Sequence, residues 1–92
     1  MEKHKTVVRV GGREYTLVSS DPPEYMHRVA AYVDRTQEEI AMATRLPSNM
    51  VAVLTSLNMA DELMKSRDEN SRLRRELMAL RQELQESRKG QA

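Results

Sequence analysis

The chain has 92 residues, enough for one small domain, and its charged residues are balanced: 15 Lys and Arg against 14 Asp and Glu leave a net charge of +1. This balance predicts no overall field that would hold nucleic acid or an acidic membrane surface. The absence of cysteine excludes a disulfide scaffold and a cysteine-based zinc site, and no apolar run approaches the roughly 20 residues of a membrane span. We therefore expect a soluble, cytoplasmic protein that self-associates and has neither nucleic-acid nor membrane partners.

Residues 6–18 predict a β-hairpin, preceded by a disordered polar tail over residues 1–5. The alternating apolar residues are interrupted by Gly11-Gly12, which supplies the positive φ angles of a two-residue turn. Pairing of Val10 with Arg13 would gather the apolar side chains of the hairpin on one face: Val8, Val10, Tyr15 and Leu17. Because a two-stranded hairpin is marginally stable alone, this face must cover helices or join a partner's strands.

A helix start follows the hairpin. Asp21 is placed to cap the helix, Pro22 suits the first turn, and Glu24 stands three residues after Asp21, at the capping-box position. We expect this helix to reach about Thr44 and to have a buried face made of Met26, Val29, Ala30, Val33 and Ile40. The solvent face would then carry Arg28, Asp34, Arg35, Glu38 and Glu39.

The longest predicted element is a helix from about Ser48 to Lys89, a stretch without Gly or Pro after Pro47. Ser48 or Asn49 is placed to cap it. At ~1.5 Å per residue it spans roughly 60 Å, longer than the core of so small a domain, so its far end must contact another chain. Closely spaced apolar residues predict packing inside a head of residues 6–64: Met50, Val53, Leu54, Leu57, Ala60, Leu63 and Met64. Asn58, within this stretch, is either solvent-facing or a buried hydrogen-bonding anchor for the hairpin or a partner helix, and we favour the anchor.

Residues 65–89 predict a parallel coiled coil, followed by a frayed tail over residues 90–92. The heptad places Asn70, Leu77 and Leu84 at position a, and Leu73 and Leu80 at position d. Position g holds Glu69, Glu76 and Glu83, and position e holds Arg74, Arg81 and Arg88. These charges attract across a parallel dimer and repel across an antiparallel one, and an Asn at position a pairs best with the same Asn of a parallel partner. With Leu57, Asn58 and Leu63, these positions form the expected self-association surface.

Two other interpretations of the long helix remain open. It could be a single solvated helix with internal ion pairs, although that would not explain the leucine seam. Arg67, Arg72, Arg74 and Arg75 also stand where a basic-zipper protein enters DNA. Asp68, Glu69 and Glu76 interrupt them, however, so no clean positive stripe would face the phosphates.

The candidates for catalysis are few. His4 and His27, the chain's two histidines, are expected to lie in the disordered tail and near a helix start, both exposed to solvent. Adjacent carboxylates such as Glu38-Glu39 and Asp61-Glu62 point in different directions on a helix and make poor metal ligands. We therefore expect no enzyme activity, no cofactor and no metal.

Three stretches carry a family resemblance. They read VRVGGREYTL over residues 8–17, VAAYVDRTQEEI over 29–40 and VAVLTSLNMADEL over 51–63. In this order and at this spacing they resemble the strand–Gly–strand, first helix and second helix of the ZapA family of bacterial cell-division proteins. That family binds and cross-links filaments of the tubulin-like protein FtsZ.

The resemblance implies an α+β fold: an N-terminal β-hairpin, one helix, then a long C-terminal helix that forms a parallel coiled coil. It implies a non-enzymatic adaptor at the division site that bundles FtsZ filaments and promotes assembly of the Z-ring. Chains would pair into parallel homodimers, and two dimers would join into a homotetramer. Charged head residues beside the Gly turn contact the filament in the family. Arg13, next to Glu14, occupies that place here, and the solvent face of the first helix around Arg28 and Arg35 is the alternative surface. A zipper-like DNA-binding protein, or a coiled-coil scaffold with another partner, is the alternative function.

Overall fold

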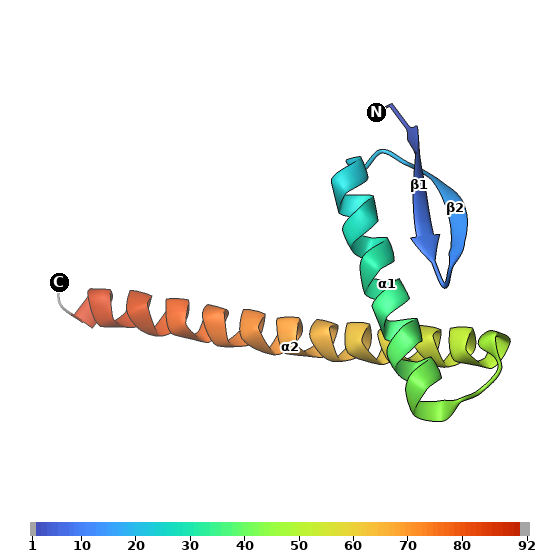
Figure 1. The fold of residues 1–92 in the computed structure, drawn as a ribbon. Coiled ribbons are helices and arrows are strands. Elements are labelled where there is room, and N and C mark those ends of the chain that lie inside the picture. Colours follow the sequence, from blue (N-terminus) through green and yellow to red (C-terminus); the bar gives the residue numbers. More distant parts are fainter. Residues whose placement is uncertain (1, 91–92) are drawn as a thin grey trace. The chain divides into compact units, whose positions relative to one another are not determined.

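The computed structural model describes residues 2–90 as two strands followed by two helices (Figure 1). The elements are β1 (His4–Val10), β2 (Arg13–Ser19), α1 (Pro23–Thr44) and α2 (Ser48–Gly90). This order confirms the predicted α+β fold with the hairpin first and the long helix last. The chain divides within α2 into two compact units, the first ending at Leu57 and the second beginning at Asn58. We call them the head unit and the tail unit and describe each by itself.

The hairpin has the predicted register. Val10 pairs with Arg13, and Val8 pairs with Tyr15, in an antiparallel ladder. Gly11 and Gly12 have φ angles of 62° and 79°, the left-handed values that a two-residue type I′ turn requires at both central positions. The two glycines therefore set the turn and, through it, the face on which every strand side chain lies.

Both strands extend further than the sequence predicts, and the first begins in the expected disordered tail. His4 and Lys5 belong to β1. The ring of His4 is also engaged, since its Nε2 donates a hydrogen bond to the carbonyl oxygen of Asp21 at 2.7 Å. At the other end of the chain, Gly90 still belongs to α2, while residues 91 and 92 of the predicted frayed tail lie outside the described residues.

The start of α1 corrects the predicted cap. The N-cap residue is Pro22, without a side-chain hydrogen bond, so Asp21 stands one position too early and Glu24 is not at the capping-box spacing. Asp21 instead bonds to Ser19: its N–H donates to the Ser19 Oγ at 3.0 Å, and that hydroxyl donates to the Asp21 carboxylate at 3.1 Å. The competing local bond explains the error, because short polar side chains next to a turn readily bond their neighbours.

The core of the head unit is small. β1 is the strand that lies against α1 (Figure 1). Of the hydrophobic residues in the part of the chain described, only Val8, Ala30 and Val51 are buried, together with the polar residues Thr6, Thr36 and Thr55. The predicted core residues Met26, Val33 and Ile40 are half-buried, while Tyr15 remains 49% exposed and Val29 38%. The predicted burial of Tyr15 and Val29 is therefore wrong within one chain.

The buried threonines differ in their hydrogen bonding. The hydroxyls of Thr36 and Thr55 donate to the carbonyl oxygens four residues earlier, Tyr32 at 2.8 Å and Val51 at 2.7 Å. The hydroxyl of Thr6 is buried and has no hydrogen-bond partner among residues 2–90. An unpaired buried hydroxyl costs stability, so Thr6 is a weak point of this core.

The start of α2 also differs from expectation. The carbonyl oxygen of Pro47 accepts the N–H groups of Met50 and Val51, both at 3.0 Å, so the cap position belongs to Pro47 rather than to Ser48 or Asn49. The closely spaced apolar residues that should pack inside the head are mostly exposed: Met50, Val53, Leu57, Leu63 and Met64. That predicted packing is wrong for this chain alone.

Candidate functional site

The hairpin turn presents one unpaired positive charge. Arg13 directly follows Gly12 and is exposed, and it forms no ion pair within residues 2–90. Glu14 bonds to Arg9 instead, with 3.2 Å between the guanidinium nitrogen and the carboxylate oxygen. The Arg9–Glu14 pair lies on the opposite face of the hairpin from Arg13, because successive strand residues alternate in direction. Arg13 is thus available to a partner, whereas Glu14 is already engaged.

The turn is bonded to α1 by a residue that the sequence placed on the solvent face. The N–H of Gly11 donates to the Oδ1 atom of Asp34 at 2.8 Å. Asp34 is half-buried, so its assignment to the solvent face is corrected. The space beside Gly11 is also limited, since a Cβ atom built there would lie 3.0 Å from the Oε1 of Gln37. Asp34 and Gln37 are three residues apart and therefore share one side of α1.

A groove of about 990 Å³ lies within the head unit. Its apolar lining comes from the hairpin, from α1 and from the start of α2. Examples are Tyr15 and Leu17 of β2, Val29 and Val33 of α1, and Val51 of α2. Arg13 and Asp34 also line it. A wide groove lined by partly exposed apolar side chains is typical of a surface that another polypeptide covers.

The other two candidate contact residues lie elsewhere on α1. Arg28 and Arg35 are exposed and seven residues apart, which places them on one side of the helix. The Arg35 guanidinium carbon lies 5.7 Å from the centre of the Tyr32 ring, within cation–π range. Neither arginine lines the groove. The structure therefore brings Arg13 to the groove and leaves Arg28 and Arg35 on a separate surface.

No group of three or more His, Cys, Asp or Glu side chains among residues 2–90 is placed to hold a metal ion. The charged residues that line the groove are Arg13, Asp34 and Glu38, and one carboxylate of this set is already bonded to the Gly11 amide. Over the same range, neither helix combines the length and the apolar character needed to cross a bilayer.

The described part of the tail unit is one continuous stretch of α2. Every residue from Ala60 to Gly90 is exposed. The four seam leucines, at positions 73, 77, 80 and 84, are 50%, 48%, 61% and 54% exposed. Asn58 is exposed within the single chain, which favours its solvent-facing alternative, while an anchor to a partner helix stays a prediction; Leu57 beside it is 62% exposed. A leucine seam left in water is expected to associate with another helix.

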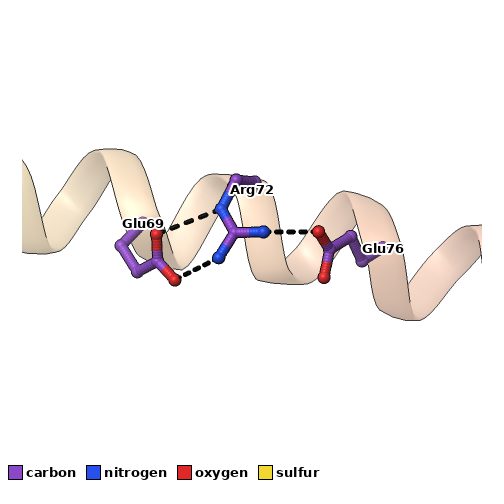
Figure 2. Close-up of polar contacts among 3 residues, drawn as sticks. All are labelled: Glu69, Arg72 and Glu76. Atoms are coloured by element: carbon purple, nitrogen blue, oxygen red, sulfur yellow. Dashed lines mark hydrogen bonds and ion pairs between the residues drawn. The ribbon is translucent and has the colours of Figure 1, made fainter.

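Arg72 links two of the predicted g-position carboxylates within the helix. Figure 2 shows its guanidinium between Glu69 and Glu76, with hydrogen bonds to both. The bond from Arg72 lowers the pKa of the Glu69 carboxyl, and the bond from Glu69 raises the pKa of Arg72. Similarly, the hydrogen bond to Asp61 raises the pKa of Lys65.

The other charged g and e residues of the heptad form no ion pair within the described chain. These residues are Glu83 and the e-position arginines, Arg74, Arg81 and Arg88. They are free to pair between chains, as the heptad predicts. Glu69 and Glu76 would share their carboxylates between Arg72 and a partner's arginine.

Known proteins resemble the chain along most of its length. The family model described as "Cell division protein ZapA" matches residues 6–89. The cell division protein ZapA of Shouchella clausii is 41% identical over 64 residues, covering 68% of this chain and 82% of that protein. The ZapA of Geobacillus kaustophilus is 37% identical over 76 residues, covering 82% and 84% respectively.

A solved structure agrees with these relatives. It is described as a ZapA mutant dimer from Geobacillus stearothermophilus, and it has a TM-score of 0.71 and 35% sequence identity, covering 84% of this chain and 91% of that one. The family model, these relatives and the shared fold agree: this chain belongs to the ZapA family of cell-division proteins.

Proposed function

We propose that this chain is a non-enzymatic adaptor that binds and bundles FtsZ filaments and so promotes assembly of the Z-ring in the cytoplasm at the division site. Membership of the ZapA family over residues 6–89 carries this proposal. The structure supports it in two ways. A small buried core and a long exposed leucine seam favour self-association, and Arg13 offers an unpaired charge at the hairpin turn.

The proposed assembly is a parallel homodimer, two of which can pair into a tetramer. The g and e charges of the tail attract only in the parallel orientation, and the relative from Geobacillus stearothermophilus is described as a dimer. Each dimer would carry two heads, and repetition of a weak contact at each head raises the overall affinity for a filament.

The orientation is tested by a single cysteine, since the chain has none of its own. Leu84→Cys places a thiol at position a, where the two copies face each other in a parallel dimer, and oxidation should produce a covalent dimer. In an antiparallel seam Leu84→Cys would not cross-link to itself, and a mixture of Asn70→Cys and Leu84→Cys chains would pair instead.

The function is tested by co-sedimentation with FtsZ filaments, with electron microscopy of the pellet to detect bundles. We expect the chain to pellet with filaments and to bundle them, and Arg13→Ala to weaken both without changing oligomer mass or thermal stability. Arg28→Ala is the matched control, because it removes the same charge from a different surface. Normal bundling by Arg13→Ala with a loss in Arg28→Ala would move the contact to α1.

The zipper-like DNA-binding alternative is decided in the same preparation by a gel shift with duplex DNA. Arg72, within the basic cluster at the start of the seam, is already bonded to two carboxylates, which disfavours phosphate binding there. A salt-sensitive shift of DNA together with no co-sedimentation of FtsZ would contradict the proposed function.

A further inference from the structure

One side chain of α1, Asp34, forms a hydrogen bond with the hairpin turn. Asp34 lies 23 residues after Gly11 in the chain, and its Oδ1 accepts the Gly11 N–H at 2.8 Å. A backbone amide bonded to an ionised carboxylate makes a stronger hydrogen bond than a neutral pair does. A two-stranded hairpin is marginally stable alone, and this bond ties its turn to α1.

The fit of Gly11 against α1 shows how close the turn comes to the helix. A Cβ atom at Gly11 would lie 3.0 Å from the Gln37 side-chain oxygen, whereas one at Gly12 would meet nothing within 4 Å. The two central residues of the turn therefore have different surroundings: Gly11 lies beside Asp34 and Gln37 of α1, and a Cβ atom at Gly12 would face open space. Arg13 follows directly.

We infer that Asp34 is a positioning residue for the partner contact: it clamps the Gly11 amide and so fixes the place from which Arg13 meets the filament. This inference rests on the proposed function for its binding partner, an acidic surface on FtsZ. The clamp acts by pre-organisation, because a turn that is already fixed loses less freedom when Arg13 binds. Asp34 itself is occupied by Gly11 and need not touch the partner.

Two substitutions separate this role from a direct charge contact. Asp34→Ala removes the acceptor, whereas Asp34→Asn keeps an oxygen of similar shape and removes only the charge. The clamp predicts that Asp34→Ala weakens co-sedimentation severalfold and that Asp34→Asn restores most of it. If the Asp34 carboxylate touched the partner directly, both variants would lose binding to FtsZ.

The experiment measures Gly11 amide hydrogen exchange by NMR and co-sedimentation with FtsZ, using the full chain in its assembled state. We expect faster Gly11 exchange in Asp34→Ala and retained protection in Asp34→Asn, with oligomer mass unchanged in both. The double variant Asp34→Ala/Arg13→Ala should bind no worse than Arg13→Ala alone, because a positioning residue has no effect once the positioned group is gone.

Three outcomes would overturn the inference: an unchanged Gly11 exchange rate in Asp34→Ala, equal loss of binding in Asp34→Asn, or additive losses in the double variant. If Asp34→Ala fails to fold, Asp34→Glu replaces it. This variant keeps the charge but displaces the oxygen by one methylene, and normal binding with unprotected Gly11 would then overturn the clamp. Failure of the unmodified chain to sediment with FtsZ would refute the proposed function instead, while the exchange data would still decide whether Asp34 holds the turn.

Discussion

The head and tail units keep their structure by different means. In the head unit, residues distant in sequence are joined: the strands by their ladder, β1 to α1 by packing, Gly11 to Asp34 and His4 to Asp21 by hydrogen bonds. In the tail unit, the ion pairs within the described range join residues three or four apart, such as Lys65 with Asp61 and Arg72 with Glu76. The head has a tertiary structure of its own, and the tail has only a helix.

This difference shows which unit depends more on a second chain. Local pairs stabilise an isolated helix weakly, so most helix stability in proteins comes from burial of an apolar face. The tail unit buries none of its seam leucines, and the head unit buries only Val8, Ala30 and Val51 among its hydrophobic residues described here. We therefore expect the tail to be fully helical only when assembled, and the head to be partly stable without assembly.

The largest expected effect comes from a charge in the seam. Leu77→Glu should lower the oligomer mass in light scattering at dilute concentration and reduce the helix content of the tail, because a buried unpaired charge is strongly disfavoured. The head should keep much of its structure. Gln82→Glu, which adds the same charge at heptad position f, should have little effect. An unchanged mass for Leu77→Glu would mean that the seam does not hold the assembly.

The second prediction acts on the head alone. Gly11→Ala should destabilise the chain by about 1–2 kcal/mol for the left-handed φ, and the new Cβ, 3.0 Å from Gln37 Oε1, adds only the small cost of shifting the end of that flexible side chain. Gly12→Ala is the matched control, since it has the same sign of φ and nothing within 4 Å of the Cβ. In thermal denaturation, Gly11→Ala should have a lower Tm than Gly12→Ala. Equal stabilities would show that contact with α1 does not restrict the turn.

The third prediction concerns the unpaired hydroxyl in the core. Thr6→Val keeps the shape of the side chain and removes a buried donor without a partner among the described residues. The free energy of unfolding should therefore rise by about 1 kcal/mol. Thr36→Val removes a hydroxyl that is hydrogen-bonded to the Tyr32 carbonyl oxygen, so it should not raise the stability in the same way. If Thr6→Val lowers stability and oligomer mass together, the hydroxyl bonds a second chain in the assembly.

The smallest effect is electrostatic. Because the hydrogen bond from Arg72 lowers the pKa of Glu69, the pair stabilises the tail helix fully above the ordinary glutamate pKa, and this contribution is lost as the pH falls through the lowered value. Arg72→Met should raise the pKa of Glu69 toward its ordinary value in an NMR titration. Arg75→Met removes a charge without an ion pair in the described chain, so it should shift the Glu69 pKa less. Equal shifts would argue against the specific bond.

The sequence was informative where structure follows from local rules. Gly11-Gly12 and the two-residue period predicted the register of the hairpin, and the lack of Gly and Pro after Pro47 predicted the full length of α2. The role of Asp34 could not be predicted in this way. It depends on a turn 23 residues away, and a helical pattern places Asp34 at the border of the solvent face. The one available signal was the turn itself, whose amides need an acceptor.

The extent of burial was harder to predict for a related reason. Periodicity identifies apolar faces but does not say whether they pack within the chain or against another one. It therefore predicts that Leu57 and Met64 pack inside the chain, although both are exposed. Periodicity also ignores threonine, and Thr6, Thr36 and Thr55 make up half of the buried set. Val51 was missed because it lies among several equally apolar neighbours.

The placement of the aromatic side chains gives each unit its own optical signal. The three tyrosines, Tyr15, Tyr25 and Tyr32, all lie in the head unit, and the chain has neither Trp nor Phe. Near-ultraviolet circular dichroism and tyrosine fluorescence therefore report on the head unit alone, whereas the far-ultraviolet signal also includes the long helix of the tail. One sample can thus show, without any label, whether the two units unfold together or in sequence as the protein is diluted or heated.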